Sequence, residues 1–179
     1  KRCIACGAPL WETHLLTLDN MPASAQHMPD AEHVGADKGL TLDLCQCSGC
    51  GLVQFDCEPV DYYRDVIRAG GYSTTMAELR RKQYKHLIET YHLEGIEVGC
   101  GQGEFLQVLK EFPVEVHGIE HDPALVELAK SKGIDVVQGF TETEDTVFPG
   151  GLYDVFLSFN FLEHQPDPVT MLRAIWNNL

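Results

Sequence analysis

The sequence predicts an α/β protein in which a small cysteine-rich module precedes a parallel sheet. In residues 94–179, short apolar runs alternate with stretches of helical periodicity, the order typical of parallel strands joined by crossover helices. A glycine-rich turn, residues 99–103, joins the first apolar run to a helix. Residues 1–57 instead contain two C-x-x-C pairs, and residues 58–93 form a linker that carries an amphipathic helix. We therefore expect a metal-binding module, a linker and the first part of an α/β domain.

The expected elements of the α/β part follow from apolar runs and helix-end residues. The strands are predicted at residues 95–98, 114–120, 134–137 and 153–159, with helices near 103–112 and 123–132 between them. Asp122 and Pro123 are typical of the N-cap and first turn of a helix. Gly133 suits the position just after a helix, where a left-handed residue is common.

Two further helices are expected at the ends of this region. Asp167 and Pro168 predict the start of a helix with a buried face of Met171, Leu172, Ile175 and Leu179. The linker helix is predicted from Thr75, with Glu78 completing a capping box. Its inward side chains are expected to be Met76, Leu79, Leu87, Ile88 and Tyr91.

The glycine turn is the clearest indication of a ligand site. Glycines allow a tight turn and close approach of a ligand, and the following helix directs free N–H groups toward it. The spacing is G-x-G-x-G rather than the G-x-G-x-x-G of dinucleotide sites, and Glu104 would repel a pyrophosphate. A nucleotide-like ligand without phosphates fits better, and S-adenosylmethionine is such a ligand. An ordinary strand-to-helix turn is the alternative.

Two acidic residues end the first two predicted strands. Glu97 precedes the glycine turn, and Glu120 follows it at about the ~20-residue spacing at which an acid reaches ribose hydroxyls. A carboxylate suits that role because it can accept hydrogen bonds from two neighbouring hydroxyls. A solvated glutamate at a strand end is the alternative for Glu120.

These segments resemble the motifs of class I S-adenosylmethionine-dependent methyltransferases. The matching parts are the acidic-x-G-x-G-x-G run from Glu97, the acid Glu120, and the tract from Asn160 to Pro168 in which Leu-Glu-His follows the fourth strand. The resemblance implies a Rossmann-like sheet of seven strands, of which residues 94–179 supply the N-terminal part. The expected cofactor-binding residues are Glu97, Gly99, Gly101, Gly103, Glu120, His121, Gly139, Phe140, Phe159 and Asn160.

Individual roles follow from the chemistry of this donor. Glu97 is expected to orient the glycine turn and the donor's amino group, and Glu120 to bind the ribose. Adenine is expected near Gly139 and Phe140, although Phe140 fits a core position equally well. Phe159 and Asn160 are expected near the methionyl part.

The N-terminal cysteines predict a structural zinc site. Cys3 with Cys6 and Cys47 with Cys50 supply four thiolates, which close a tetrahedral coordination sphere and leave no position for water. Cys45 is a rival to Cys47 as a ligand.

Disulfide bonding is the alternative for these cysteines. The chain has seven cysteines, an odd number, and no secretory signal, which favours a reducing, cytoplasmic compartment. Cys57 and Cys100 are expected to be unligated.

The whole chain resembles the sugar C-methyltransferases, whose N-terminal module binds zinc. The matching residues are the four cysteines Cys3, Cys6, Cys47 and Cys50, then Gly51 to Gln54, Tyr72 to Thr75, Glu97 to Gly103, Glu120, and Asn160 to His164. The resemblance implies carbon methylation of a nucleotide-linked keto sugar in sugar biosynthesis. It also implies that the remaining strands and a C-terminal domain follow the end of this chain. A longer protein and a truncated fragment are both consistent with a chain that starts at Lys1.

Carbon methylation needs a base that removes a proton next to a carbonyl. His164 is the best candidate because an imidazole titrates near neutrality. Glu163 either orients it or is a surface residue, and Tyr72 from the linker is a second candidate catalytic residue. A structural histidine that packs against the cofactor loop is the alternative for His164.

Composition limits the partners that we expect. The net charge of −14 argues against nonspecific binding to nucleic acid. No apolar run approaches the roughly 18 residues that a membrane span needs. The basic cluster of Arg80, Arg81, Lys82 and Lys85 is either a solvated helix face or a contact for a phosphorylated or nucleotide-linked substrate. The remaining alternatives are an O- or N-methyltransferase for another small molecule, and an inactive module that binds zinc and adenosyl compounds.

Overall fold

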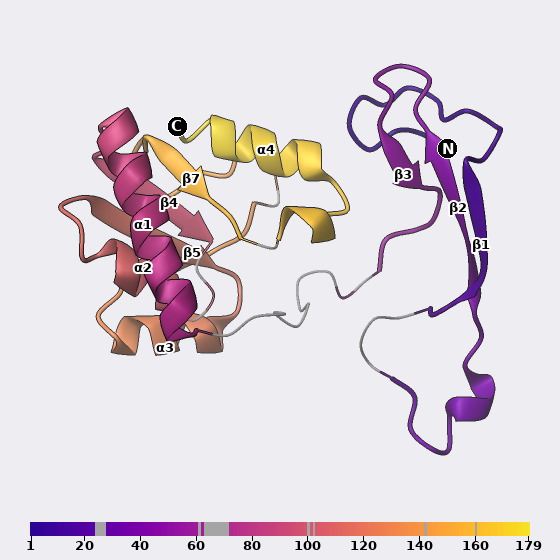
Figure 1. Cartoon of the computed structure of the whole chain (residues 1–179), viewed down its shortest axis with the longest axis horizontal. Coiled ribbons are helices and arrows are strands. Elements are labelled where there is room, and N and C mark those ends of the chain that lie inside the picture. Colours follow the sequence, from indigo (N-terminus) through magenta and orange to yellow (C-terminus); the bar gives the residue numbers. More distant parts are fainter. Residues whose placement is uncertain are drawn as a thin grey trace. The chain divides into compact units, whose positions relative to one another are not determined.

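The protein is seen here in a computed structural model that describes residues 1–23, 28–60, 62, 72–99, 101, 103–141, 143–159 and 161–179, with the backbone alone at 96–99. The chain divides into two compact units (Figure 1). One comprises residues 1–67 and 166–169, and the other comprises residues 68–165 and 170–179. Each unit has its own sheet.

The N-terminal unit contains a three-stranded antiparallel sheet in the order β1-β2-β3. The strands are β1 (Leu16–Met21), β2 (Leu40–Gln46) and β3 (Val53–Phe55), and the short 3-10 helix η1 (Val34–Ala36) lies between β1 and β2. Leu16, Leu44 and Phe55 are register partners across the three strands and share one face. Leu16 and Phe55 are exposed.

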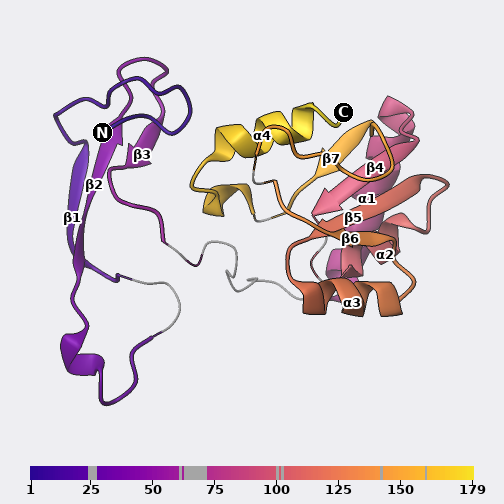
Figure 2. The same cartoon turned by 180° about the vertical axis from the view of Figure 1, so that it is seen from behind.

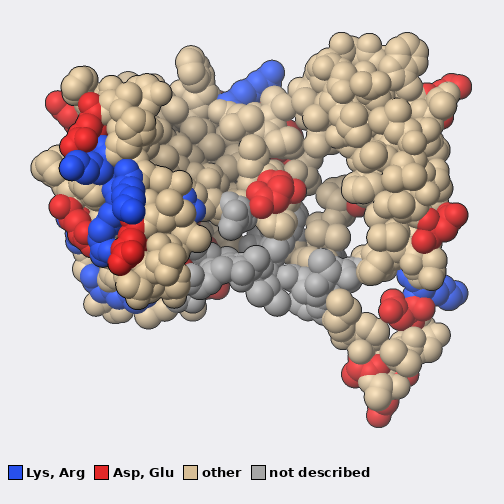
Figure 3. Space-filling model, in the orientation of Figure 1, with Lys and Arg blue, Asp and Glu red and all other residues tan. Residues whose placement is uncertain are grey.

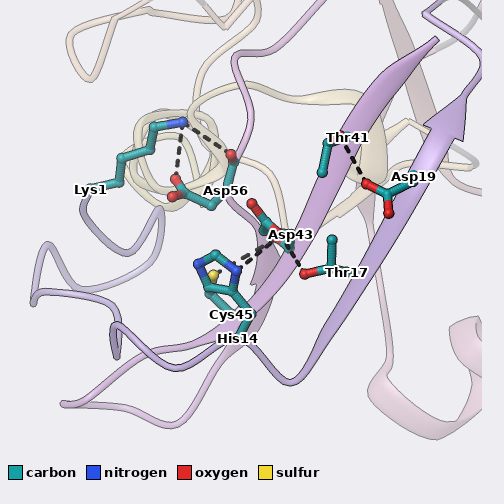
Figure 4. Close-up of polar contacts among 8 residues, drawn as sticks. All are labelled: Lys1, His14, Thr17, Asp19, Thr41, Asp43, Cys45 and Asp56. Carbon is teal, nitrogen blue, oxygen red and sulfur yellow. Dashed lines mark hydrogen bonds and ion pairs between the residues drawn. The ribbon is translucent and has the colours of Figure 1, made fainter.

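The opposite face of this sheet is polar. The Thr17 hydroxyl donates to Asp43 Oδ1 at 2.6 Å, and Nδ1 of His14 lies 2.9 Å from the same oxygen (Figure 4). Thr41 likewise donates to Asp19 across the strands, at 3.1 Å. Among the described residues of this unit, the buried apolar side chains are those of Cys3, Cys45 and Cys47. The unit therefore has hardly any aliphatic core.

The second unit contains a four-stranded parallel sheet in the order β6-β5-β4-β7. Its strands are β4 (Gly95–Gly99), β5 (Glu115–Glu120), β6 (Val136–Gln138) and β7 (Val155–Leu157). The chain moves outward from β4 through β5 to β6 and then returns to the other side of β4. Such a reversal creates a crevice at the carboxyl ends of the central strands, where α/β proteins bind ligands.

Helices lie on both faces of this sheet (Figures 1 and 2). They are α1 (Thr74–Tyr91), α2 (Glu104–Leu109), α3 (Pro123–Ser131) and α4 (Pro168–Trp176), with the 3-10 helix η3 (Leu162–His164) before α4. One core cluster centres on α1, α2 and α3, and includes Leu106 and Val126. The other contains Phe148, Tyr153 and Met171. None of the described helices has both the length and the hydrophobicity that crossing a bilayer requires.

The predicted ends of α3 agree with the structure, whereas α1 begins earlier and α2 ends earlier than predicted. The Asp122 carboxylate accepts a hydrogen bond from the Ala124 N–H at 2.7 Å, and Pro123 opens α3. Gly133 follows α3 with φ of 73°. Ser73, rather than Thr75, caps α1, by accepting from the Met76 N–H at 3.1 Å.

The predicted strand at residues 153–159 was too long, because only Val155–Leu157 pair with β4. The Tyr153 N–H instead donates to the carbonyl of Asn178. The Asp154 carboxylate accepts from the N–H groups of Glu94 and Gly95, at 2.6 and 2.9 Å, and so binds the start of β7 to the start of β4. The prediction from the apolar run therefore overestimated the length of the paired strand.

The predicted buried faces of α1 and α4 were partly wrong. Ala77 and Tyr84 are the buried residues of α1, whereas Met76, Leu79 and Tyr91 are exposed. In α4, Met171, Ala174 and Ile175 are buried, and Leu172 is exposed. Small alanine side chains allow helices to pack closely, and a prediction from hydrophobicity alone ignores this effect.

Candidate functional site

The residues expected to bind the donor follow the carboxyl ends of the four parallel strands. Gly101 follows β4, Glu120 ends β5, Gly139 follows β6, and Phe159 follows β7. In a parallel sheet these ends lie along one edge. The side chain of Glu97 and residue Asn160 lie outside the described residues, and Gly99 is described by its backbone alone.

The glycine turn has the backbone conformation that only glycine adopts readily. Gly101 and Gly103 have φ of 53° and 76°, in the left-handed region. A Cβ at Gly103 would also collide with Cδ1 of Ile134 and lie 3.4 Å from Cβ of Ala129. Gly103 is therefore required for packing the start of α2 against the α3–β6 segment, a requirement that exists without any ligand.

Glu120 is a nearly buried carboxylate with one oxygen already engaged. Its side chain is 10% exposed, and Nδ1 of His121 lies 2.9 Å from Oε1. The Asp122 N–H donates to the same Oε1 at 3.0 Å. Among the described residues, no hydrogen bond reaches Oε2. The carboxylate is thus oriented by the chain and still has acceptor capacity for a ligand hydroxyl.

Three rings form a row next to Glu120, which we call the ring row: His121, Phe140 and Phe161. The centroids of His121 and Phe140 are 6.0 Å apart and those of Phe140 and Phe161 are 5.7 Å apart, both in edge-to-face geometry. Phe140 is half-buried and belongs to neither core cluster as the described residues define them. Its neighbour Phe161 packs against the second core cluster.

The three candidate catalytic residues are exposed or half-buried. His164 and Glu163 lie in η3, after β7, with Nε2 and Oε1 4.0 Å apart, too far for a hydrogen bond. Tyr72 is 55% exposed. Together with the Glu111 carboxylate, which has the larger effect, it raises the pKa of Arg81. Tyr72 therefore lies beside Arg81.

Arg80 is a residue that the sequence did not single out from its basic cluster. Its guanidinium carbon lies 3.9 Å from the ring centroid of Phe159, after β7, and 5.3 Å from that of Phe105, in the first turn of α2. Arg80 therefore lies beside the segments that follow β4 and β7. Its Nε is buried and has no hydrogen-bond partner among the residues that the structure describes.

Tyr84, one helical turn further along α1, has a second unsatisfied polar group. The residue is 2% exposed, its ring packs against Phe159, and its hydroxyl has no partner within the described part of the chain. Burial raises the pKa of Tyr84 to about 12, although the nearby Arg80 charge opposes this. Buried polar groups without partners are rare in folded proteins, so this pair favours a bound polar ligand or water at this place.

The other basic residues have structural or solvent-exposed positions. Arg81 Nε and Nη2 donate to the two carboxylate oxygens of Glu111, at 2.7 and 2.8 Å, which joins α1 to the segment after α2. Lys85 lies 3.8 Å from Glu89 on the exposed face of α1. Figure 3 shows basic and acidic side chains interleaved on this side of the molecule. The basic cluster is thus not a single anion-binding patch.

The four predicted metal ligands come together in the N-terminal unit. The Sγ atoms of Cys3, Cys6, Cys47 and Cys50 all lie within 4.8 Å of one another. The Sγ atoms of Cys3 and Cys50 are 3.7 Å apart, and those of Cys6 and Cys47 are 3.5 Å apart. Tetrahedral zinc with bonds of about 2.3 Å places its sulfur ligands about 3.8 Å apart, so the donor set fits zinc.

Cys45 lies outside this cluster, so Cys47 rather than Cys45 is the fourth member of the thiol set. Its buried thiol points to the carbonyl of Asp43, at 3.8 Å. The backbone N–H of Cys50 and that of Gly49 instead donate to Sγ of Cys47, and they lower the pKa of Cys47 to about 6. Thiolate at Cys47 is the form that binds a metal ion.

Comparison with known proteins identifies the family. Residues 76–179, more than half of the chain, match the family model described as a methyltransferase domain. The chain belongs to the methyltransferase domain family. The matched region of this methyltransferase domain includes α1, the parallel sheet and α4.

Individual relatives match this methyltransferase domain in part. The ubiquinone biosynthesis O-methyltransferase of Colwellia psychrerythraea is 29% identical over 89 residues, 47% of this chain and 36% of that protein. The ajmaline N-methyltransferase of Rauvolfia serpentina is 29% identical over 89 residues, 45% of this chain and 30% of that protein. The chain thus covers about a third of the length of these relatives.

Solved structures are also similar to part of the chain. The plantazolicin methyltransferase BpumL, in complex with a triazolic desmethylPZN analogue and SAH, has 19% sequence identity and a TM-score of 0.49. That match covers 60% of this chain and 44% of the other.

Proposed function

We propose that this protein is an S-adenosylmethionine-dependent methyltransferase that acts on a small molecule. The family match over residues 76–179 carries the proposal. The crevice supports it, because the glycine turn after β4 and the Glu120 carboxylate at the end of β5 lie on neighbouring strands. The G-x-G-x-G spacing and Glu104 at the start of α2 disfavour a pyrophosphate, whereas the turn and the Glu120 carboxylate suit an adenosyl ligand without phosphates.

The donor site that we propose uses residues from all four strand ends. When bound, the donor supplies an electrophilic methyl group on a sulfonium. Glu120 accepts from the ribose, Gly99 and Gly101 permit close approach, and Gly139 and Phe140 border the adenine. Glu97, Phe159 and Asn160 complete the methionyl side, and Gly103 supports the turn by packing.

Arg80 is proposed to bind the donor's carboxylate. Its guanidinium is held by two aromatic rings at the crevice, and its buried Nε lacks a partner among the described residues. A carboxylate is the natural partner for an arginine with unused donors. The Tyr84 hydroxyl offers a further donor beside it.

Titration calorimetry on the full-length protein tests this donor site. We expect S-adenosylmethionine and S-adenosylhomocysteine to bind and NADH not to bind. Arg80→Met should weaken S-adenosylmethionine binding by about tenfold or more, since a charged hydrogen bond is lost. Lys82→Met, on the exposed side of the same helix, is the matched control and should bind normally. Preference for NADH, or equal effects of the two variants, would refute the site.

For the acceptor, we propose a nucleotide-linked keto sugar that is methylated at carbon, in sugar biosynthesis. His164 would remove the proton next to the carbonyl, with Glu163 beside it and Tyr72 as the second candidate. Support comes from the order of the motifs along the chain and from the position of η3 directly after β7. An oxygen or nitrogen acceptor is the alternative, favoured by the names of the two curated relatives.

Replacing His164 by Asn tests the base. Turnover of the keto sugar should fall by about 100-fold or more at saturating donor, the size of a general-base contribution, while donor affinity stays unchanged. Glu163→Gln should have a smaller effect. Normal turnover by His164→Asn with intact donor binding would exclude His164 as the base.

The cysteine cluster is proposed to bind a structural zinc ion. Cys3, Cys6, Cys47 and Cys50 would supply four thiolates, a set that leaves no open coordination position for catalysis. A cytoplasmic location, where thiols stay reduced, fits this use of cysteine. Metal analysis of protein purified without chelators should find one zinc ion per chain, and none would refute the proposal.

A further inference from the structure

The contacts of the Glu120 carboxylate indicate a role for its neighbour His121. An ionised carboxylate can only accept hydrogen bonds, so Nδ1 of His121, 2.9 Å from Oε1, must carry the proton and donate. The Asp122 N–H donates to the same oxygen. Both contacts that the described chain makes with the carboxylate therefore fall on Oε1.

The ring row holds the His121 imidazole in place. Its ring meets Phe140 edge-to-face, and Phe140 meets Phe161 in the same way. The Gln138 side-chain amide also donates to the His121 carbonyl at 3.2 Å. The ring contact with Phe140 restricts the orientation of the imidazole, and hence the direction in which Nδ1 can donate.

We propose that His121 is a positioning residue, which acts on the donor through Glu120. By occupying Oε1, it turns Oε2 toward the crevice as the oxygen that accepts from the ribose hydroxyls. The inference rests on the proposed function, since it deepens the account of the same donor site. His121 itself makes no hydrogen bond to the donor in this arrangement.

Two substitutions separate the hydrogen bond from the ring. His121→Asn keeps an N–H donor close to the position of Nδ1 and removes the ring. His121→Phe keeps a ring against Phe140 and removes the donor. We expect His121→Phe to weaken binding of S-adenosylhomocysteine by about tenfold, and His121→Asn to stay within about threefold of the wild type.

A double-mutant cycle with Glu120→Gln then tests whether the effect passes through Glu120. If it does, adding His121→Phe to Glu120→Gln should cause no further loss of affinity. Calorimetry on the full-length protein gives the four dissociation constants, and thermal unfolding of each variant checks that the fold is intact. At saturating donor, kcat should be unchanged in His121→Phe while the donor KM rises.

The possible results distinguish a failure of this inference from a failure of the proposed function. No binding of S-adenosylhomocysteine by the wild type would refute the donor site altogether. Binding by the wild type with additive losses in the cycle would show that His121 contacts the donor directly. A larger loss for His121→Asn than for His121→Phe would show that the ring is what matters. Either of the last two results would overturn the positioning role and leave the methyltransferase proposal standing.

Discussion

The two units of this chain are stabilised in different ways. In the methyltransferase domain, side chains such as Leu106 and Phe148 are almost completely buried in clusters that contain little besides apolar groups. In the N-terminal unit, the buried apolar side chains among the described residues are three cysteines, two of them in the four-thiol cluster. A small unit buries little apolar surface, and the zinc ion proposed for the four thiols would compensate for this.

The contrast extends to the polar contacts. The N-terminal sheet has a face of exposed and half-exposed pairs such as Thr17 with Asp43, which contribute little to stability in water. The methyltransferase domain instead buries Asn178, whose side chain accepts from the Phe148 N–H and donates to the carbonyls of Thr146 and Ala174. We therefore expect the two units to respond to different perturbations.

Loss of one thiol should have the largest effect. Cys47→Ser removes a proposed zinc ligand, and structural zinc contributes about 10–16 kcal/mol in small zinc-finger peptides. The N-terminal unit should therefore unfold while the methyltransferase domain keeps its structure. Zinc content, together with NMR spectra of the full-length protein, measures both. Cys45→Ser, whose thiol lies outside the cluster, is the control and should retain the metal; loss of zinc in both variants would contradict the assignment.

Truncation of the apolar core should have the next largest effect, now on the other unit. Leu106 is 0% exposed, and Leu106→Ala should lower the free energy of unfolding of the methyltransferase domain by about 2–5 kcal/mol. Leu172 is 51% exposed in α4, and Leu172→Ala should change it by less than about 0.5 kcal/mol. Urea denaturation gives both values. Similar losses for the two variants would mean that the core is not where the structure places it.

A methyl group at Gly103 should destabilise the turn by two additive routes. Gly103→Ala combines a left-handed φ of 76° with a collision against Ile134. Gly151 has φ of 107° and nothing within 4 Å of an added Cβ, so Gly151→Ala introduces backbone strain alone. We expect Gly103→Ala to cost at least about 1 kcal/mol more than Gly151→Ala, because of overpacking. Partial rescue of Gly103→Ala by Ile134→Val would confirm the collision.

The smallest effect is expected at Asp154, and it depends on pH. The N–H groups of Gly95 and Glu94 lower the pKa of the Asp154 carboxyl below its unfolded value of about 3.9. A lowered folded pKa adds stability above the unfolded pKa, and this is lost as pH falls through the folded value. The difference in Tm between wild type and Asp154→Asn should therefore be constant above about pH 5 and shrink below about pH 4. A difference that is the same at pH 3 and pH 7 would contradict it.

Local signals in the sequence predicted much of this fold. The glycine turn, the Asp122–Pro123 helix start and the order of strands and helices were recognisable because they depend on backbone conformation and neighbouring residues. The cysteine pairs were recognisable because thiolates at that spacing have few other uses. The exposed side of α1 was predicted wrongly, because Ala77 is buried and Leu79 is not.

The sequence by itself determined the class of fold, the cysteine cluster and the strand ends along which the donor site is proposed. Only the tertiary structure decided what the individual polar groups do. Arg80 and Arg81 are neighbours in sequence, yet one lies over Phe159 and the other pairs with Glu111. Likewise, nothing local predicts that the Asp154 carboxylate accepts from the N–H groups of Glu94 and Gly95 at the start of β4. Such roles depend on which side chains meet across elements distant in sequence, and packing alone determines that.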